Sequence, residues 1–339
     1  MKEITEPLLQ WFAENRREFP WREDKNPYHV WVSEIMLQQT RIEAVLNYYK
    51  RFTDALPDVQ ALREIEDDAL LKLWEGLGYY SRARNLKKAA QIIVSEYHGI
   101  FPSSFEELRN LPGIGDYTAG AIASICFNEP VPAVDGNVLR VISRVTGSYN
   151  NVLLQQTKKK VIEELSGIMP AASGDFNEAL MELGETVCLP NTAPSCNICP
   201  LSELCKANLN DLTGVLPVRI KKTKRRREEL TVFIMEAPDG CIALEKRETS
   251  GLLSGMYQFP NIKGYYSEKE LYSILDSWHL KPAQVSFSIE AKHVFTHIVW
   301  FMKGYHVQVK NKSDRFIWVS TEELKNDYPL PTAFQKMLP

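Results

Sequence analysis

Four of the six cysteines in this 339-residue chain are clustered in one short segment, in the pattern C-x7-C-x2-C-x5-C: Cys188, Cys196, Cys199 and Cys205. Thiolates that lie so close in sequence are typical of a metal or iron–sulfur site, whereas disulfide frameworks are typical of small secreted domains. The first twenty residues lack the apolar core of a secretory signal. We therefore expect a metal or iron–sulfur site in a soluble, cytoplasmic protein that does not enter a membrane.

The length of the chain and a change in its sequence pattern predict two domains. A chain of 339 residues is too long for one ordinary core. In the first part, apolar residues recur every three or four positions, as in helices, and GLG, PGIG and EPVP interrupt them. Later runs such as LTVFIM, AQVSFSIE and RFIWVS predict strands, with one helix in SEKELYSILDSW. We predict a helical domain over 1–218, a basic linker over 219–229 and an α/β domain over 230–339.

The distribution of charge limits where a nucleic acid could bind. The net charge is −3, which argues against a broadly basic DNA-binding face. Residues 230–339 hold 12 basic and 12 acidic side chains, and seven basic side chains lie in RIKKTKRRR, from Arg219 to Arg227. Any contact with DNA must therefore be concentrated on particular loops.

Residues 105–126 predict two helices joined by the tight turn LPGIG. Gly113 and Gly115 would let backbone N–H groups approach a phosphate, and the following helix, which begins at about Asp116, favours an anion at its N-terminus. This pattern predicts a helix–hairpin–helix, which holds the DNA backbone without reading its sequence. An ordinary helix connection fits the same glycine pattern and is the alternative.

Two carboxylates are candidates for acid–base chemistry. Asp135, in PAVDGNVLRV, precedes a predicted helix, so its default role is an N-cap. Glu34, in WVSEIMLQQT, has apolar neighbours on both sides, and burial among such residues raises a carboxyl pKa toward the range of a general acid. An exposed helix glutamate is the alternative for Glu34. Gln38, Gln39 and Thr40 follow at the predicted helix end, where polar side chains could reach base edges.

Several longer segments then appear in a characteristic order: PWR, WVSEIMLQQTRIE, WEGLGYYSRARN, LPGIGDYTAGAI, AVDGNV and FNEAL. Together they resemble the adenine DNA glycosylases of the MutY type, in the helix–hairpin–helix glycosylase superfamily, almost continuously over the first 210 residues. The resemblance implies a monomeric base-excision-repair enzyme, associated with the nucleoid, that acts on double-stranded DNA. Its substrate would be adenine mispaired with 8-oxoguanine or guanine.

The same resemblance assigns roles to individual residues. Glu34 would protonate N7 of the departing adenine and then assist the attack of water, and Asp135 would stabilise the oxocarbenium-like sugar. Asn137 and Tyr117 would support that site. The residues expected to contact the substrate are Trp21, Arg22 and Glu178 around the flipped adenine, and Gln39, Thr40, Leu77 and Tyr79 beside the lesion. A stacked aromatic such as Tyr79 can offset part of the cost of extruding a base; packing on the preceding helix is the alternative for this tyrosine.

Tyr117 separates this chain from the bifunctional relatives. Endonuclease III-like enzymes carry a lysine at the corresponding position, which forms a Schiff base with the sugar. Without an amine there, the resemblance implies a glycosylase with little or no lyase activity. Two alternatives stay open: an endonuclease III-like enzyme acting on oxidised pyrimidines, and a non-catalytic iron–sulfur protein that binds DNA.

The cysteine segment resembles the [4Fe–4S] loop of these glycosylases, whose spacing is C-x6-C-x2-C-x5-C. This chain has one residue more after Cys188, while the other two spacings are intact. We expect the extra residue to be absorbed as loop, and a structural zinc site is the alternative.

Residues 230–339 resemble the Nudix-like C-terminal domain of the same enzymes. The glutamate cluster REUxEE, which holds divalent metal in Nudix hydrolases, does not follow GLLSGMYQFP, so we expect no pyrophosphatase activity. The family recognises 8-oxoguanine through a Phe-Ser-His loop, for which this chain has Phe295, Thr296 and His297. Thr296 keeps the hydroxyl and adds a methyl group. Ordinary strand positions are the alternative for Phe295 and His297.

Overall fold

The computed structural model describes residues 1–220, 225–248 and 250–338, which divide into two compact units. One consists of Met1–Arg63 and Asn85–Lys221, and we call it the helical unit. The other consists of Glu64–Arg84 and Lys222–Pro339, and we call it the sheet unit. Part of the predicted basic linker, residues 221–224, lies outside the described residues.

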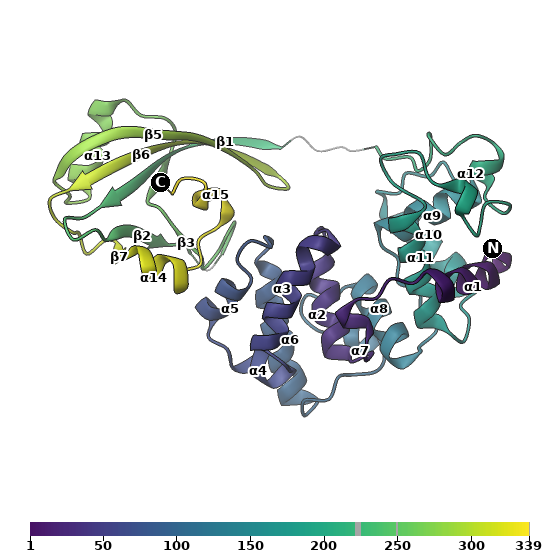
Figure 1. The fold of residues 1–339 in the computed structure, drawn as a ribbon. Coiled ribbons are helices and arrows are strands. Elements are labelled where there is room, and N and C mark those ends of the chain that lie inside the picture. Colours follow the sequence, from purple (N-terminus) through teal and green to yellow (C-terminus); the bar gives the residue numbers. More distant parts are fainter. Residues whose placement is uncertain (221–224, 249, 339) are drawn as a thin grey trace. The chain divides into compact units, whose positions relative to one another are not determined.

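The helical unit is built from helices joined by short loops (Figure 1). Its helices are α1 (Thr5–Asn15), α2 (Pro27–Leu37), α3 (Ile42–Ala55), α4 (Val59–Glu64), most of α6 (Ser81–Glu96), α7 (Phe105–Arg109), α8 (Asp116–Phe127), α9 (Gly136–Thr146), α10 (Gln155–Ser166), α11 (Ser173–Thr186) and α12 (Lys206–Leu209). Helix α8 carries mostly small side chains, so it packs closely against α2, α7 and α11. Helices α1, α9, α10 and α11 share a second apolar core. The elements that surround α8 also supply the residues of the candidate site.

The turn between α7 and α8 has the predicted helix–hairpin–helix geometry. Gly113 has φ +79°, and a Cβ at this position would lie 2.6 Å from Cβ of Asn85. Both the left-handed backbone and the close contact therefore require glycine. Helix α8 begins at Asp116, where the sequence predicts it, with Gly115 as its N-cap.

The sheet unit is an α/β fold with strand order β3-β2-β1-β6-β5, in which β1 runs parallel to β6 and the other pairs are antiparallel. Off this path, β4 pairs with β1 and β7 pairs with β2. The strands are β1 (Arg226–Glu236), β2 (Ile242–Lys246), β3 (Tyr257–Gln258), β4 (Asn261–Lys263), β5 (Pro282–Val294), β6 (Ile298–Val309) and β7 (Ile317–Val319). The helices are α5 (Asp67–Leu73), α13 (Glu268–Ser277), α14 (Thr321–Asn326) and α15 (Thr332–Gln335).

The run LTVFIM in β1 is apolar throughout because both faces of the sheet are covered. Val232 and Ile234 belong to a core that includes Phe334 of α15. Phe233 and Met235 belong to a separate core with Leu271 of α13 and other residues. Alternate residues of one strand thus enter two cores, as expected for a sheet between two helical layers.

Two boundaries differ from the sequence prediction. Arg226–Glu229, expected in the linker, form the start of β1, because the long strand β6 offers them backbone partners from Ile298 onward. Residues 64–84, expected in the helical domain, belong to the sheet unit. Their helical pattern is unremarkable, and the contacts that attach them involve residues far along the chain, which a local pattern cannot reveal.

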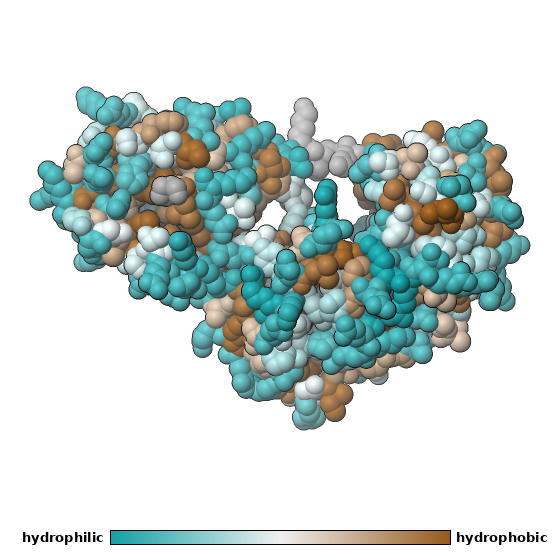
Figure 2. Space-filling view, viewed as in Figure 1, coloured by the Kyte–Doolittle hydropathy of each residue, from teal (hydrophilic) through white to brown (hydrophobic). Residues whose placement is uncertain are grey.

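Among the described residues, no helix is both long and apolar enough to cross a bilayer. On the face of the molecule in Figure 2, hydrophilic residues predominate and apolar residues are scattered between them. Scattered apolar side chains of this kind are usual on protein surfaces.

Candidate active site

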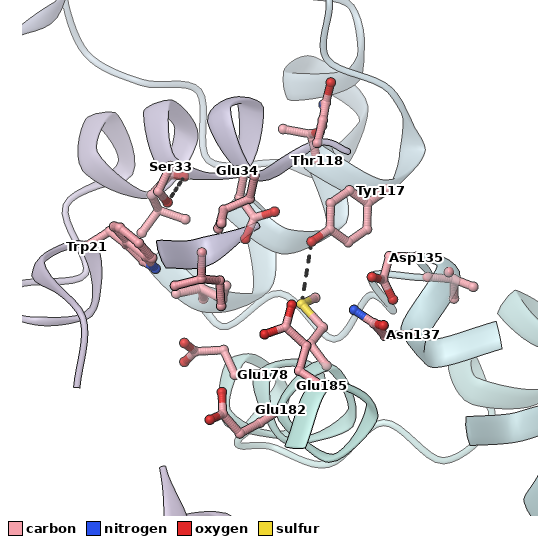
Figure 3. A pocket seen from close by; sticks show the side chains of 18 of the residues that line it. Trp21, Ser33, Glu34, Tyr117, Thr118, Asp135, Asn137, Glu178, Glu182 and Glu185 are labelled. Atoms are coloured by element: carbon pink, nitrogen blue, oxygen red, sulfur yellow. Dashed lines mark hydrogen bonds between the residues drawn. The ribbon is translucent and has the colours of Figure 1, made fainter. Parts of the chain in front are cut away.

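A cavity of about 660 Å³ in the helical unit collects most of the residues that the sequence singled out. Side chains from α2, α8, α9, α11 and the short 3₁₀ helix Pro20–Arg22 before α2 line it (Figure 3). The predicted site residues among the lining are Trp21, Arg22, Glu34, Gln39, Tyr117, Asp135, Asn137 and Glu178, together with Gly113 and Gly115 of the hairpin. Residues separated by more than 140 positions in sequence are therefore brought to one cavity.

Glu34 lies on α2 and is 8% exposed, so the predicted burial of this carboxyl is observed. Its Oε2 atom has no hydrogen-bond partner among the described residues. Burial raises the pKa of Glu34 to about 7; the Tyr117 hydroxyl opposes this shift, and the negative charge of Asp135 adds to it. A carboxyl group with this pKa is protonated in part of the molecules at neutral pH, so it can act as an acid and, after losing its proton, as a base.

Asp135 is the N-cap of α9, and its Oδ1 accepts a 2.7 Å hydrogen bond from the backbone N–H of Val138. Burial raises the pKa of Asp135, while the backbone N–H groups of Val138 and Asn137 oppose that rise. The positive end of the α9 dipole favours the ionised form as well. The default N-cap role is therefore real, and it places a second carboxylate in the cavity that contains Glu34.

Asn137 connects the cavity to the cysteine segment through Arg140. Nη2 of Arg140 donates to Oδ1 of Asn137 at 2.8 Å and to the carbonyl oxygen of Gly184 at 2.7 Å. Nε of Arg140 donates to the carbonyl oxygen of Cys188 at 2.7 Å. One buried guanidinium therefore fixes both the amide of Asn137 and the backbone at the first cysteine.

The opposite wall of the cavity holds an ion-pair network. Nε of Arg22 lies 2.7 Å from Oε1 of Glu178, and Nη2 of Arg22 lies 3.0 Å from Oε2 of Glu182. Arg17 pairs with Glu182 and, at 2.8 Å, with Glu185. Burial raises the pKa of Glu178 and Arg22 opposes that rise. The sequence analysis missed Arg17, Glu182 and Glu185, although the glutamates of FNEALMELGE recur at positions i, i+4 and i+7 and therefore share one face of α11.

Tyr117 lines the cavity from the first turn of α8, and its hydroxyl donates to Sδ of Met181 at 3.5 Å. Burial raises the pKa of Tyr117 well above its ordinary value, so the phenol stays neutral. Among the described residues that line the cavity, the one amine belongs to Lys158 of α10, which the sequence analysis also missed.

The four clustered cysteines line a separate and almost wholly apolar cavity, together with residues such as Val141 and Leu183. None of their thiols forms a disulfide. Nη1 of Arg144 donates to Sγ of Cys188 at 3.2 Å. The loop after Cys188 closes through a 3.0 Å hydrogen bond from the Ser195 N–H to the carbonyl oxygen of Val187. Among the described residues, no three or more His, Cys, Asp or Glu side chains are grouped so that they could hold a metal ion.

The remaining predicted residues lie outside the 660 Å³ cavity. Thr40 follows the end of α2, where its hydroxyl donates to the carbonyl oxygen of Gln38 at 3.4 Å. Leu77 lies in the sheet unit and is buried, so its side chain is not presented to solvent. Tyr79, in the same unit, is 45% exposed, and its φ of +49° is unusual for a tyrosine.

Phe295, Thr296 and His297 form the turn between β5 and β6. Thr296 and His297 are exposed, and the Thr296 hydroxyl lies 3.1 Å from the hydroxyl of Tyr79. The ring of Phe295 packs edge-on against Trp300, with 4.8 Å between ring centroids. The two residues that the sequence assigned separately to the lesion, Tyr79 and Thr296, are thus in direct contact.

Comparisons with known proteins show which family models the two parts of the chain match. The family model of the HhH-GPD superfamily of base excision DNA repair proteins matches residues 32–171, and the NUDIX domain model matches residues 231–339. These matches confirm the predicted order of a helix–hairpin–helix domain and a Nudix-like domain.

Curated relatives show the family of the chain, and solved structures share its helical fold. The adenine DNA glycosylase of Buchnera aphidicola subsp. Baizongia pistaciae is 34% identical over 98% of this chain and 94% of its own length. The adenine DNA glycosylase of Homo sapiens is also 34% identical, over 90% of this chain and 67% of its own length. A thermostable thymine-DNA glycosylase matches 61% of this chain and 96% of its own, with 28% identity and a TM-score of 0.56. Endonuclease III in a non-covalent DNA complex shares the fold, with a TM-score of 0.53 at 23% identity over 62% of this chain and 98% of its own. The chain therefore belongs to the adenine DNA glycosylase family, within the HhH-GPD superfamily of base excision DNA repair proteins.

Proposed function

We propose that this protein hydrolyses the N-glycosidic bond of adenine mispaired with 8-oxoguanine or guanine in duplex DNA, with little or no lyase activity. One observation carries the proposal: Glu34, a buried carboxyl whose pKa is raised to about 7, shares a cavity with the helix-capping carboxylate of Asp135. An acid and an anion in one cavity are what the departure of a neutral base from a sugar requires.

In the proposed reaction, the protonated form of Glu34 donates its proton to N7 of adenine as the bond to the sugar breaks. The base leaves as neutral adenine, and the sugar becomes an oxocarbenium-like cation. The ionised Asp135, held by backbone N–H groups, stabilises that positive charge. Glu34, now ionised, takes a proton from the water that attacks the sugar. Asn137 and Tyr117 support the geometry around these two carboxyl groups.

Trp21, Arg22 and Glu178 would hold the extruded adenine. Trp21 offers an aromatic surface on the cavity wall, and the ion pair of Arg22 with Glu178 offers fixed donors and acceptors. A carboxylate such as Glu178 accepts hydrogen bonds from the exocyclic amine of adenine. A base with a keto group at that position could not donate such a hydrogen bond. Extruding a base costs a few kcal/mol, and a mispaired base costs less.

The opposite base would be recognised by Tyr79 and by the turn that contains Phe295, Thr296 and His297, with Gln39 entering the duplex beside the lesion. 8-Oxoguanine differs from guanine in carrying an oxygen at C8 and a hydrogen at N7. The paired hydroxyls of Tyr79 and Thr296 are exposed and can donate to the first group and accept from the second.

We further propose that Cys188, Cys196, Cys199 and Cys205 hold a [4Fe–4S] cluster. Four free thiols around one apolar cavity, with Arg144 donating to one of them, are chemically suited to such a cluster. The cluster would cross-link the segment after α11, and no step of base release passes through it. The hairpin glycines Gly113 and Gly115 would meet a DNA phosphate with their backbone.

The test uses purified protein and a duplex that carries adenine opposite 8-oxoguanine. We expect an alkali-labile site at the adenine and an intact strand without alkali. Absence of the alkali-labile site would overturn the proposed function. Strand breaks without alkali would instead indicate a lyase, and loss of those breaks in Lys158→Ala would identify the amine that lines the cavity as its nucleophile.

A further inference from the structure

The segment Glu64–Arg84 belongs to the sheet unit although the helical unit surrounds it in sequence. This segment carries Tyr79 on a loop between α5 and α6, with a left-handed backbone and an exposed ring. A tyrosine in that conformation persists only where its surroundings hold it. The contacts that attach the segment to the sheet therefore decide where Tyr79 lies.

One attachment is made by Asp68, at the start of α5. Both of its carboxylate oxygens lie 2.9 Å from Nζ of Lys246, on β2. The hydroxyl of Tyr257, on β3, donates to Oδ2 of Asp68 at 2.9 Å. A carboxylate with two donors from two neighbouring strands has a defined position, unlike an isolated surface ion pair.

A second attachment is made by Glu75, whose side chain is 16% exposed. Its Oε1 accepts the backbone N–H of Leu330 at 2.8 Å and the side-chain amide of Gln335 at 2.9 Å. Its Oε2 lies 2.9 Å from Nζ of Lys72, which also donates to the carbonyl oxygens of Leu324 and Tyr328. Leu330 is buried, so loss of the carboxylate would leave its N–H group without a partner.

A short chain of contacts connects Glu75 to Tyr79. Nε1 of Trp74 donates to the carbonyl of Gly78 at 3.1 Å, and Arg82 donates to the same carbonyl at 3.2 Å. The Arg82 guanidinium also lies 5.4 Å from the ring centroid of Tyr79. The loop that carries Tyr79 is therefore held by hydrogen bonds at Gly78, close in sequence to Glu75, where the segment is attached to the sheet unit.

We propose that Asp68 and Glu75 are positioning residues for recognition of the base opposite the adenine. They fix the loop of Tyr79 on the sheet unit, so that Tyr79 and Thr296 present their hydroxyls as one preorganised surface. The inference rests on the proposed function, because it needs a preference for 8-oxoguanine. Fixing the two hydroxyls before DNA binds removes an ordering cost that would otherwise weaken recognition.

The experiment compares single-turnover adenine release from duplexes with 8-oxoguanine or guanine opposite the adenine. The variants are Asp68→Asn, Glu75→Gln and the double variant. We expect the double variant to lower the preference for 8-oxoguanine about tenfold, as loss of hydrogen bonds to charged groups implies. Release opposite guanine should stay within about twofold, because the variants leave the catalytic cavity unchanged.

Asp239→Asn is the matched control. It breaks an exposed pair with Lys312 in the same unit, and the contacts of Asp239 do not involve residues 64–84. An equal loss of preference in this control, or an equal loss of rate on both duplexes, would overturn the inference. If the double variant does not fold, the Asp68→Asn variant alone tests the inference. The ion pair of Asp68 with Lys246 is partly exposed, so we expect the protein to fold without it.

A Tyr79→Phe background separates positioning from a general structural role. If Asp68 and Glu75 act through the Tyr79 hydroxyl, the double variant should lower the preference no further in this background. Additive losses would overturn the inference. Equal release of adenine from both duplexes by the wild-type protein would also overturn the inference, because there would be no preference for these residues to support. Release from neither duplex would overturn the proposed function instead.

Discussion

Nε of Arg22 lies 2.7 Å from Oε1 of Glu178, and both side chains are largely buried. The same guanidinium also reaches Glu182, whose side chain is buried as well. Arg22 therefore compensates negative charge on two carboxylates at the wall of the proposed adenine site.

Removing this guanidinium should destabilise the protein strongly. Arg22→Ala leaves the buried carboxylate of Glu178 without its ion-pair partner, while Glu182 keeps its pair with Arg17. We expect the free energy of unfolding to fall by about 3–5 kcal/mol. Urea denaturation at pH 7 measures this change. Lys160→Ala, which removes an exposed partner of Glu164, is the control and should cost less than about 1 kcal/mol. Equal effects of the two substitutions would contradict the prediction.

How much the sequence could predict differs from residue to residue. The N-cap of Asp135 and the burial of Glu34 follow from local patterns, since capping and apolar neighbours are local properties. The partners of Arg17 lie more than 160 residues away, on α11, so no local pattern connects them. The attachment of Asp68 to Lys246 likewise depends on the folded sheet. Residues whose role comes from distant contacts were therefore missed, while motif residues were found.

The rate of base release should depend on the protonation of Glu34. The pKa of Glu34 is about 7, and only the protonated form can donate to adenine. We expect the single-turnover rate constant to fall as pH rises above 7, by about tenfold per unit once the group is mostly ionised. Glu34→Gln should show almost no release at any pH while still binding the duplex. Normal pH dependence in this variant, or loss of duplex binding, would show that Glu34 is not the acid.

The carboxyl group of Glu34 should also lower the free energy of unfolding at high pH. The folded-state pKa of about 7 lies above the ordinary value of 4.5, so the folded protein binds this proton more tightly than the unfolded chain. The stability of the wild type therefore falls as pH rises from 4.5 to 7 and stays lowered above that range. We expect Glu34→Gln to be the more stable protein at pH 8, by as much as about 3 kcal/mol, with little of this gain at pH 4. Urea denaturation at both pH values measures the difference, and an equal gain at pH 4 would contradict this explanation.

The cysteine assignment predicts a coloured protein. A [4Fe–4S] cluster should give the pure protein a yellow-brown colour with broad visible absorbance, together with bound iron and sulfide. Cys199→Ser should lose much of this absorbance, whereas Cys241→Ser, which changes a free cysteine of the sheet unit, should keep it. A colourless wild-type protein with one zinc per chain would show that the site is a structural zinc site.

Helix α11 closely approaches Asn137 at Gly184. A Cβ added at Gly184 would lie 2.7 Å from Cβ of Asn137 and 3.3 Å from its Cα, so Gly184→Ala must displace Asn137. The same glycine accepts a hydrogen bond from Arg140, which also holds the amide of Asn137. A shift of this kind at a reaction centre can lower the rate of base release about 100-fold. Gly167→Ala is the matched control, because a Cβ there has its nearest neighbour at 3.7 Å, which is an ordinary contact. Single-turnover release at saturating protein measures both variants, and a Gly184→Ala rate equal to that of Gly167→Ala would mean that the position of Asn137 does not limit the reaction.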